Sequence, residues 1–348
     1  MGSAKTPLRK RRGAGRVTLT EVARAADVSA ISVSRFFNQP EQVSQPLRER
    51  IQAAVEALGY VPNRVAGGLA SARGRIVGMV VPNLSGPIFA PTLQAFSDTL
   101  SRHDYQVLLA SSDFDPVREE RAVRAFLGWS PAALVVTSRF HSPATEKLLA
   151  QADLPVVETW DYTPERAPVQ VGFVHRDAGA QACRYLLDKG YRRIAFVPNS
   201  VPGDLSALER RDGYLDVLAE AGLPATVWVP SPHATPLDAG RQAMEALLAC
   251  DPRPDAILFA NDNLAAGALL AGQRAGVRMP EDMAIVGFGD YPFAGLLLPS
   301  LTTLRPPAQA IGEVAAQRVL QALGVIAVEG DVARLNRLHC EVIERESS

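Results

Sequence analysis

The chain has 348 residues, of which 47% are hydrophobic and 21% charged, so it is long enough for two or three domains with separate cores. Its formal net charge of −1 conceals an uneven distribution: residues 1–76 hold 13 Lys and Arg against 5 Asp and Glu, and the remaining residues hold 23 against 32. A basic N-terminal part joined to an acidic body predicts a polyanionic partner for that part alone.

The cysteines and the hydropathy pattern exclude other classes of protein. The three cysteines lie far apart and form no CxxC pair, which argues against a disulfide framework and favours a reducing compartment. No apolar region follows the basic residues near the N-terminus, and no apolar run reaches about 18 residues. We therefore expect a cytoplasmic protein with neither a secretory signal nor a membrane partner.

Residues 1–16 are polar, basic and without periodicity. Two interpretations stay open for them. They form a disordered basic arm, or they are an extension left by cloning or by the choice of start site.

Residues 17–62 predict a small domain of three helices. Thr20 can cap the first helix, and Asp27 occupies a turn in which a short polar side chain tolerates left-handed backbone geometry. Ser29 can cap the second helix, whose buried stripe is formed by Val33 and Phe37. The remaining faces of this helix carry small polar side chains and one arginine. That combination fits the major groove of DNA and allows contacts with base edges.

A third helix and a weaker segment follow. Ser44 and Pro46 open the third helix, and Gly59 closes it. Residues 63–71 have a faint helical pattern, which two glycines oppose by about 1 kcal/mol each relative to alanine. A helix this short is not stable alone in water, so we expect it to form only where a partner supports it.

Apolar strand-like runs alternate with amphipathic helices after residue 75, a pattern typical of parallel sheets covered on both faces. Strands are expected near 75–82, 105–111, 132–137, 155–159, 169–173, 193–197, 226–230, 255–260 and 283–288. Helices are expected in most of the gaps, for example over 116–127, 175–188, 206–221, 235–249 and 261–275. Nine strands in more than 200 residues favour two doubly wound lobes, with ligands bound beyond the carboxyl ends of the strands.

These motifs, in this order, resemble those of the LacI/GalR family of bacterial transcription factors. The resemblance covers residues 18 to about 345 and is carried by the helix-turn-helix, Gly59 to Arg64, the weak helix ending at Leu69-Ala70, Asn261-Asp262, and Pro280 to Phe288. It implies an α/β protein: a small all-α helix-turn-helix head and a two-lobed, doubly wound parallel-sheet core like that of periplasmic binding proteins.

The resemblance also implies the domain boundaries. They are a basic arm at 1–16, a DNA-binding domain at 17–62, a hinge helix and linker at 63–74, and an effector-binding and dimerisation domain at 75–345. Within the last, lobe 1 is expected at about 75–173 and 304–325, and lobe 2 at about 174–303 and 326–345. Within the family, the chain looks most like the gluconate-utilisation repressors, on Ser34-Arg35-Phe36, Thr137-Ser138-Arg139, Leu154 to Glu158, and Gln170 to Phe173.

In this family the start of the second helix reads bases, which places that role on Ala30, Ile31, Ser34 and Arg35. Ala30 and Ile31 offer only apolar contacts, and Arg35 can donate hydrogen bonds to guanine O6 and N7. For Arg35 the alternatives are a phosphate contact or a salt bridge with a nearby acid. The positions that match phosphate contacts, each of which can equally be a cap or turn residue, are Thr18, Ser29, Asn38 and Tyr60.

Leu69 matches the residue that relatives insert as a wedge into the minor groove, where two copies pry apart a central base step. The alternative is a leucine that packs on the core. Two adjacent wedges require a homodimer on a near-palindromic double-stranded operator. No leucine heptads follow residue 345, so a four-chain assembly is not supported.

Arg210 matches the ligand-binding arginine that the family places three residues before a glycine, and its guanidinium suits a carboxylate or vicinal hydroxyls. The alternative is a surface salt bridge. Asn261 can cap a helix and reach a ligand at once. Trp160 is either a platform beneath a polyol or a core residue, and His175 is expected on the surface. The further effector-binding candidates are Asn83, Ser85, Phe89, His141, Glu158, Trp160 and Asp161.

Gly289 stands where sugar-binding relatives carry an aspartate that grips hydroxyls. Loss of that carboxylate removes a charge that would repel an anionic ligand, so the expected effector is a sugar acid such as gluconate or a derivative. The alternative is that Gly289 only allows a turn and Asp290 takes over the contact.

The sequence contains no HExxH, GxxxxGK[ST], GxSxG or GxGxxG motif, and its five histidines are scattered. We therefore expect no enzyme, no catalytic residues, no metal and no cofactor. The favoured function is an effector-controlled, nucleoid-associated transcriptional regulator, a repressor by analogy with the family. The competing interpretations are a soluble sugar-binding receptor without a DNA role, and a regulator that responds to a neutral sugar.

Overall fold

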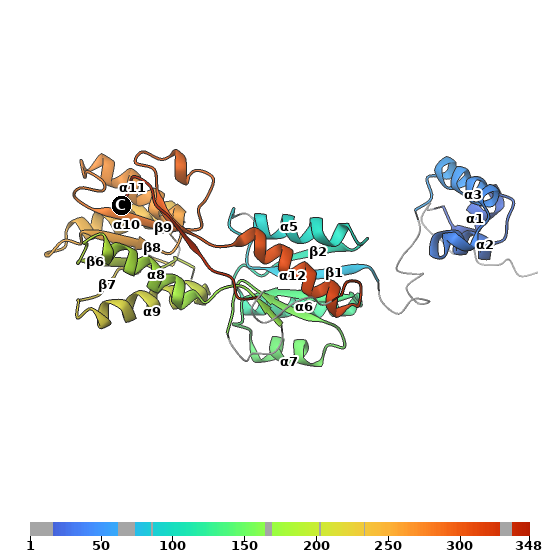
Figure 1. The fold of residues 1–348 in the computed structure, drawn as a ribbon, viewed down its shortest axis with the longest axis horizontal. Coiled ribbons are helices and arrows are strands. Elements are labelled where there is room, and N and C mark those ends of the chain that lie inside the picture. Colours follow the sequence, from blue (N-terminus) through green and yellow to red (C-terminus); the bar gives the residue numbers. More distant parts are fainter. Residues whose placement is uncertain are drawn as a thin grey trace, which may run out of the picture. The chain divides into compact units, whose positions relative to one another are not determined.

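The computed structural model describes residues 17–61, 74–84, 86–163, 169–201, 203–232, 234–327 and 336–348. Leu69, Ser85, the arm at 1–16 and the short helix expected within 63–74 lie outside these ranges, as does the side chain of Asn38. The chain forms two compact units, residues 1–74 and 75–348 (Figure 1). Among the helices of the described ranges, none has both the length and the apolar composition that a bilayer crossing requires.

The first unit contains the helices α1 (Leu19–Ala25), α2 (Ala30–Asn38) and α3 (Gln45–Leu58), with a 3-10 turn, η1 (Pro40–Gln42), before α3. Asp27 has a φ of 51°, and Gly59 ends α3 with a φ of 59°, as the sequence predicted. The expectation that Thr20 caps α1 is wrong. Thr18 is the cap, because its hydroxyl accepts from the Glu21 amide while the Glu21 carboxylate accepts from the Thr18 amide, in a reciprocal capping box.

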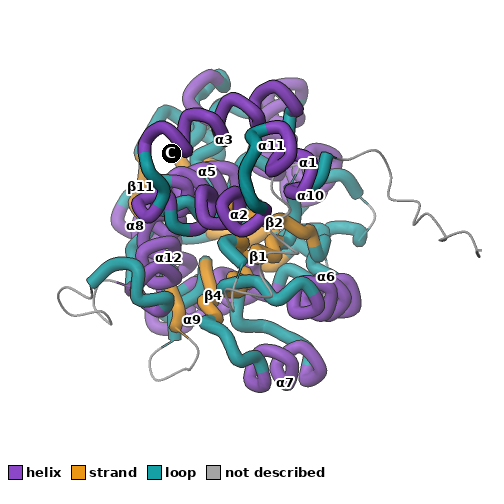
Figure 2. The backbone as a smooth tube through the Cα atoms, turned by 90° about the vertical axis from the view of Figure 1, so that its right-hand side faces the viewer, coloured by secondary structure: helices purple, strands orange, loops and turns teal. Residues whose placement is uncertain are grey.

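The first lobe of residues 75–348 is a five-stranded parallel sheet with strand order β2-β1-β3-β4-β5. Its strands are β1 (Ile76–Val81), β2 (Gln106–Ser111), β3 (Ala133–Thr137), β4 (Val156–Thr159) and β5 (Val169–Val171). Helices α5 (Ala90–Ser101) and α12 (Ala308–Ala322) cover one face, and α6 (Pro116–Gly128) and α7 (Pro143–Gln151) cover the other (Figure 2). Along β1, Val77 and Met79 pack with the first pair and Val80 with the second, because side chains of a strand alternate between faces.

The second lobe is a six-stranded sheet with strand order β11-β10-β9-β8-β6-β7. Its strands are β6 (Ile194–Val197), β7 (Thr226–Val227), β8 (Ala256–Phe259), β9 (Ala284–Phe288), β10 (Thr302–Arg305) and β11 (Glu341–Ile343), with the 3-10 turn η2 (Ala294–Leu296) before β10. All neighbours are parallel except β10 and β11. Figure 1 shows α8 (His175–Asp188) and α9 (Leu205–Glu220) on one side, and α10 (Pro236–Leu248) and α11 (Asp262–Arg274) on the other. The structure thus confirms the two-lobed α/β architecture and adds β10 and β11, which the sequence analysis did not predict.

The chain passes between the lobes three times (Figure 1). It leaves β5 for α8, returns from β10 to α12, and leaves again for β11. The third passage comes later than the expected boundary at 325/326. Residues 336–338 still belong to the first lobe, since the Gly172 amide donates to the Asn336 carbonyl and the Leu338 amide donates to the Gly172 carbonyl.

Candidate functional site

The outward face of α2 carries the residues that the sequence assigned to base reading. Ala30 and Arg35 are exposed, Ser34 is half-buried, and 69% of Ile31 is exposed. Within residues 17–61 the structure gives Arg35 no ion pair, which leaves its guanidinium available to a polyanion. On the opposite face Val33 is fully buried in the core of the three helices.

The expected phosphate-contacting residues have structural roles in the same unit. Thr18 caps α1, and Ser29 caps α2 by accepting from the Ser32 amide at 3.1 Å. Tyr60 is only 9% exposed, and its ring packs against Phe37 with centroids 5.9 Å apart. Burial raises the pKa of the Tyr60 hydroxyl. A cap on the surface can still meet a phosphate, whereas the Tyr60 ring mainly supports the core.

A cavity of about 700 Å³ lies between the two lobes of residues 75–348. It is walled by loops that follow the carboxyl ends of strands in both sheets, which is where open α/β sheets bind ligands. Of the predicted effector-binding residues that the structure describes, those that line it are Asn83, Phe89, Trp160, Arg210 and Asn261.

Arg210 lies on α9 and is 6% exposed. Its Nη1 donates to His175 Nδ1 at 2.9 Å, its Nη2 donates to the Ala260 carbonyl at 3.2 Å, and its guanidinium lies 4.0 Å from the centre of the Phe288 ring. Its Nε has no hydrogen-bond acceptor among the described residues. The guanidinium is therefore held by neutral groups and has no hydrogen-bonded carboxylate in the described part of the chain, which refutes the surface salt bridge considered above.

His175 is buried, and its expected place on the surface is wrong. It is 3% exposed at the first position of α8, where Nε2 donates to the Trp160 carbonyl at 2.8 Å and Nδ1 accepts from Arg210. Burial and the positive charge of Arg210 lower the pKa of His175 well below its usual value, so the ring is neutral. A neutral imidazole can accept from Arg210, and thereby orients the guanidinium.

The other cavity-lining candidates combine structural and ligand-facing positions. Asn261 caps α11 through the Leu264 amide, and Asn83 accepts from the Gly86 amide at 3.0 Å. Trp160 has a φ of 68° and packs edge-on against Phe89, with centroids 4.9 Å apart. Its indole Nε1 lacks an acceptor among the described residues. Trp160 is thus both a core residue and part of the cavity wall.

Three candidates lie behind the first-lobe wall and do not line the cavity. The side chains of His141 and Glu158 are buried. His141 lies within ion-pair distance of Glu119 and Glu158, and Glu158 accepts a hydrogen bond from Gln170. Asp161 accepts from Arg139 Nε at 3.2 Å, and burial raises the pKa of this carboxyl to about 6. Arg139 also bonds Glu209 of α9, so it connects the two lobes.

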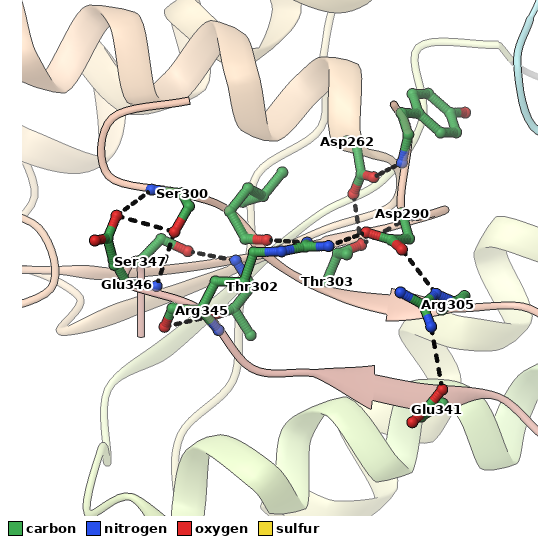
Figure 3. A network of polar contacts seen from close by, with 12 residues as sticks. Asp262, Asp290, Ser300, Thr302, Thr303, Arg305, Glu341, Arg345, Glu346 and Ser347 are labelled. Carbon is green, nitrogen blue, oxygen red and sulfur yellow. Dashed lines mark hydrogen bonds and ion pairs between the residues drawn. The ribbon is translucent and has the colours of Figure 1, made fainter. Parts of the chain in front are cut away.

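Gly289 and Asp290 do not line the cavity either. Gly289 has a φ of 128°, and a Cβ there would collide with the ring of Tyr291, which does line the cavity. The Asp290 carboxylate is fully engaged, accepting from Arg305 Nε and Arg345 Nη2 at 2.7 Å each (Figure 3). The structure thus argues against Asp290 as the replacement sugar ligand.

Several cavity residues were not predicted from the sequence. They include Glu119 of α6, Phe288 of β9, and the loop residues Asn199, Asp204 and Tyr291. Asp204 stands directly before an amphipathic helix and caps α9 through the Ala207 amide at 3.0 Å, so a capping signal was present. Glu119 resembles an ordinary helix-surface acid in sequence, and only the fold shows that it faces the cavity. In the described residues no cluster of three or more His, Cys, Asp or Glu is arranged to hold a metal ion.

Comparison with known proteins agrees with this arrangement. Residues 18–63 match the description "Bacterial regulatory proteins, lacI family", and residues 183–348 match "Periplasmic binding protein-like domain". The HTH-type transcriptional regulator GntR of Escherichia coli strain K12 is 33% identical over 308 residues, covering 88% of this chain and 91% of that protein.

Solved structures give the same result. A Lacl family transcriptional regulator from Silicibacter pomeroyi is similar with a TM-score of 0.87 at 30% identity, covering 95% of this chain and 99% of that one. The lac repressor dimer bound to operator and an anti-inducer has a TM-score of 0.81 at 25% identity, with 95% and 99% coverage.

A helix-turn-helix head joined to two lobes that enclose a cavity defines a ligand-binding transcriptional regulator, a class without enzymatic activity. The extent of the similarity to GntR identifies the family. The chain belongs to the lacI family of bacterial regulatory proteins and is a DNA-binding transcriptional regulator.

Proposed function

We propose that this regulator binds a near-palindromic operator as a homodimer, acts as a repressor, and responds to a sugar acid such as gluconate. The outward α2 face with Ile31 and Arg35 supports direct base reading. The similarity to the lac repressor dimer on its operator supports dimeric binding, and the similarity to GntR regulators supports the choice of effector.

The observation that carries the effector class is the state of Arg210. The buried guanidinium is hydrogen-bonded only to a neutral imidazole and a carbonyl, and its Nε–H has no acceptor among the described residues. The negative charge of Asp204 acts on it without a hydrogen bond, so a direct carboxylate partner is still missing in the described part of the chain. A carboxylate accepts two parallel hydrogen bonds from such a group and neutralises it. Trp160, whose buried indole Nε1–H also lacks an acceptor among the described residues, belongs to the same cavity wall.

Calorimetry on the full chain tests the effector class. We expect gluconate, its keto derivatives or its phosphorylated derivatives to bind, and neutral hexoses to bind at least tenfold more weakly. Arg210→Lys should weaken the sugar acid because a single ammonium cannot form the bidentate contact. Tight binding of neutral hexoses alone contradicts the sugar-acid assignment and supports the neutral-sugar alternative.

A mobility-shift titration on the DNA upstream of the protein's own gene tests regulation. We expect a retarded complex that the sugar acid dissociates, since effector and DNA affinities are coupled reciprocally by about 1–3 kcal/mol. A complex that the effector strengthens would reverse the proposed direction of control without changing the class of effector.

Leu69 is proposed to act as the minor-groove wedge of the hinge. Leu69→Ala should weaken operator binding and reduce DNA bending while leaving effector affinity unchanged, because the contact is made only on DNA. Mobility shift with circularly permuted fragments measures both quantities. An operator affinity equal to that of the unsubstituted protein is incompatible with the wedge role.

A further inference from the structure

A chain of buried polar groups lies directly behind the first-lobe wall of the cavity. His141, from the loop before α7, has its Nδ1 2.5 Å from Glu119 Oε1 of α6 and its Nε2 3.6 Å from Glu158 Oε1 of β4. The side-chain Nε2 of Gln170, on β5, donates to Glu158 Oε2 at 2.6 Å. The side-chain Oε1 of Gln170 accepts from the backbone amide of Thr163 at 2.7 Å. The cluster therefore ties together three elements of the lobe.

The charge state of this cluster follows from its geometry. The His141 side chain is only 1% exposed, and burial disfavours its charged form. The hydrogen bond to Glu119 and the charges of Glu119 and Glu158 outweigh that effect and raise the pKa of His141 to about 9. Two carboxylates around one imidazolium leave a net charge of −1, and the member that reaches the cavity is an acid.

Glu119 is the one member of this cluster that lines the cavity. It lies in the first turn of α6, and its side chain retains 11% of its surface, compared with 1% for both His141 and Glu158. One of its oxygens is bound to His141, and in the described part of the chain Oε2 has no hydrogen-bond partner. An ionised carboxylate oxygen on a cavity wall can only accept, so it suits a ligand hydroxyl and repels a ligand carboxylate.

We propose that Glu119 is a specificity-determining residue that accepts a hydrogen bond from a hydroxyl of the effector, and that buried His141 is the positioning residue that orients its carboxylate. This rests on the proposed function, since it assumes a hydroxylated acid as effector. Arg210 on the second lobe then receives the carboxylate of the ligand and Glu119 on the first lobe receives a hydroxyl. One ligand contacts both lobes, and its orientation in the cavity is fixed.

The variant Glu119→Gln changes this contact without changing its size. The amide oxygen remains the partner of the His141 Nδ1–H, so the amide nitrogen, a donor, faces the cavity in place of an acceptor. Gluconate should therefore bind at least tenfold more weakly by calorimetry, the range expected when a hydrogen bond to a charged group is lost. The matched control is Glu120→Gln, the adjacent acid, which pairs with Arg124 on the outside of α6. It should bind gluconate within twofold of the unsubstituted chain.

A series of monodeoxy gluconates identifies the hydroxyl concerned. One monodeoxy gluconate should bind the unsubstituted chain and Glu119→Gln with equal affinity, because it lacks the hydroxyl that donates a hydrogen bond to Glu119. The positioning role of His141 has its own readout. In His141→Gln the Glu119 carboxylate loses its cationic neighbour and keeps Glu158, so gluconate affinity should fall as the pH drops from 8 to 5. The unsubstituted chain should show a smaller fall over the same range, set by groups such as Asp161 and Asp262, whose pKa values are raised to about 6 by burial.

The outcomes separate the two proposals. If Glu119→Gln binds gluconate within twofold of the unsubstituted chain, with melting curves showing both folded, the assignment of Glu119 is overturned and the proposed function stands. If His141→Gln shows no pH dependence beyond that of the unsubstituted chain, the positioning role is overturned. If the unsubstituted chain binds no sugar acid, the proposed function fails, and this inference fails with it.

Discussion

Two buried cations of residues 75–348 have opposite surroundings. His141 lies between two carboxylates, so its charge is compensated inside the fold. Arg210 contacts a neutral imidazole, a carbonyl and an aromatic face, so its charge stays available to a ligand. Burial alone therefore does not distinguish a structural ion from a binding residue. The identity of the partners does.

His141 should make the stability of the protein depend on pH above neutrality. Its pKa is 6.5 in an unfolded chain and about 9 in the fold, so its contribution is complete below pH 6.5 and is lost as the pH rises through 9. That contribution is on the order of 3 kcal/mol. The melting temperature should fall between pH 6.5 and 9, and His141→Gln should remove most of that slope.

Other shifted groups titrate outside this window. Burial raises the pKa of Asp161 and Asp262 to about 6. These acids therefore lower the free energy of unfolding as the pH rises from about 4 to about 6, and their contribution does not change above about pH 6. Burial raises the pKa of Cys183 and Cys340 to about 12, and these thiols affect stability only above their ordinary value of 9. If the melting temperature of His141→Gln falls between pH 6.5 and 9 as steeply as that of the unsubstituted chain, His141 is not the source of this pH dependence.

Asp290 should matter for stability and not for effector binding. Its two oxygens join Arg305 of β10 to Arg345 of the C-terminal segment (Figure 3). Asp290→Asn removes the charge from both pairs, and the cost should be about 1–3 kcal/mol in the free energy of unfolding. Gluconate affinity, measured by calorimetry, should stay within twofold. A large loss of affinity in a folded variant would instead place Asp290 in the binding site.

At the scale of elements, glycines set how closely the helices of the second lobe approach. A Cβ on Gly179 of α8 would collide with the Arg210 carbonyl, and one on Gly213 of α9 would collide with the Arg176 carbonyl. Gly240 and Gly267 form the same reciprocal contact between α10 and α11. The close approach of α8 and α9 brings His175 and Arg210 within hydrogen-bond distance, so the packing of two helices builds the site.

Gly213→Ala should separate α8 from α9. The added methyl group meets backbone that cannot rotate away, and overpacking of this kind costs about 1–3 kcal/mol. Arg210 should then lose its contact with His175, and gluconate should bind at least tenfold more weakly. Gly128→Ala is the matched control, because that glycine ends α6 with nothing within 4 Å of an added Cβ. If the two variants behave alike, the packing argument is wrong.

The sequence predicted the regular elements better than the site. Continuous apolar strands and capped helices are local signals, so nine strands and the helices between them were predictable. Strands β10 and β11 were missed, and their pairing joins segments that helix α12 separates in the chain, which no local pattern reveals. His175 was misjudged because its burial depends on Trp160 and Arg210, 15 and 35 residues away in the chain. Glu119 faces the cavity only because α6 packs as it does.

At the scale of the whole molecule, charge and folding units coincide. The chain divides between residues 74 and 75; residues 1–74 hold 12 Lys and Arg against 5 Asp and Glu, a balance of +7, and residues 75–348 hold 24 against 32, a balance of −8. The second unit has its own hydrophobic clusters in both lobes. Attraction to a polyanion should therefore reside in one unit and recognition of the effector in the other.

A truncated chain of residues 75–348 should keep effector binding and lose DNA binding. Calorimetry should give a gluconate affinity within twofold of the full chain, because every cavity-lining residue is retained. The full chain should lose about a thousandfold or more in DNA affinity between about 50 and about 200 mM salt if six or more phosphates are neutralised. Fluorescence anisotropy with labelled duplex measures this slope. Retention of duplex by the truncated chain, or a DNA affinity of the full chain that does not change with salt, would contradict the assignment of nucleic-acid binding to the N-terminal unit.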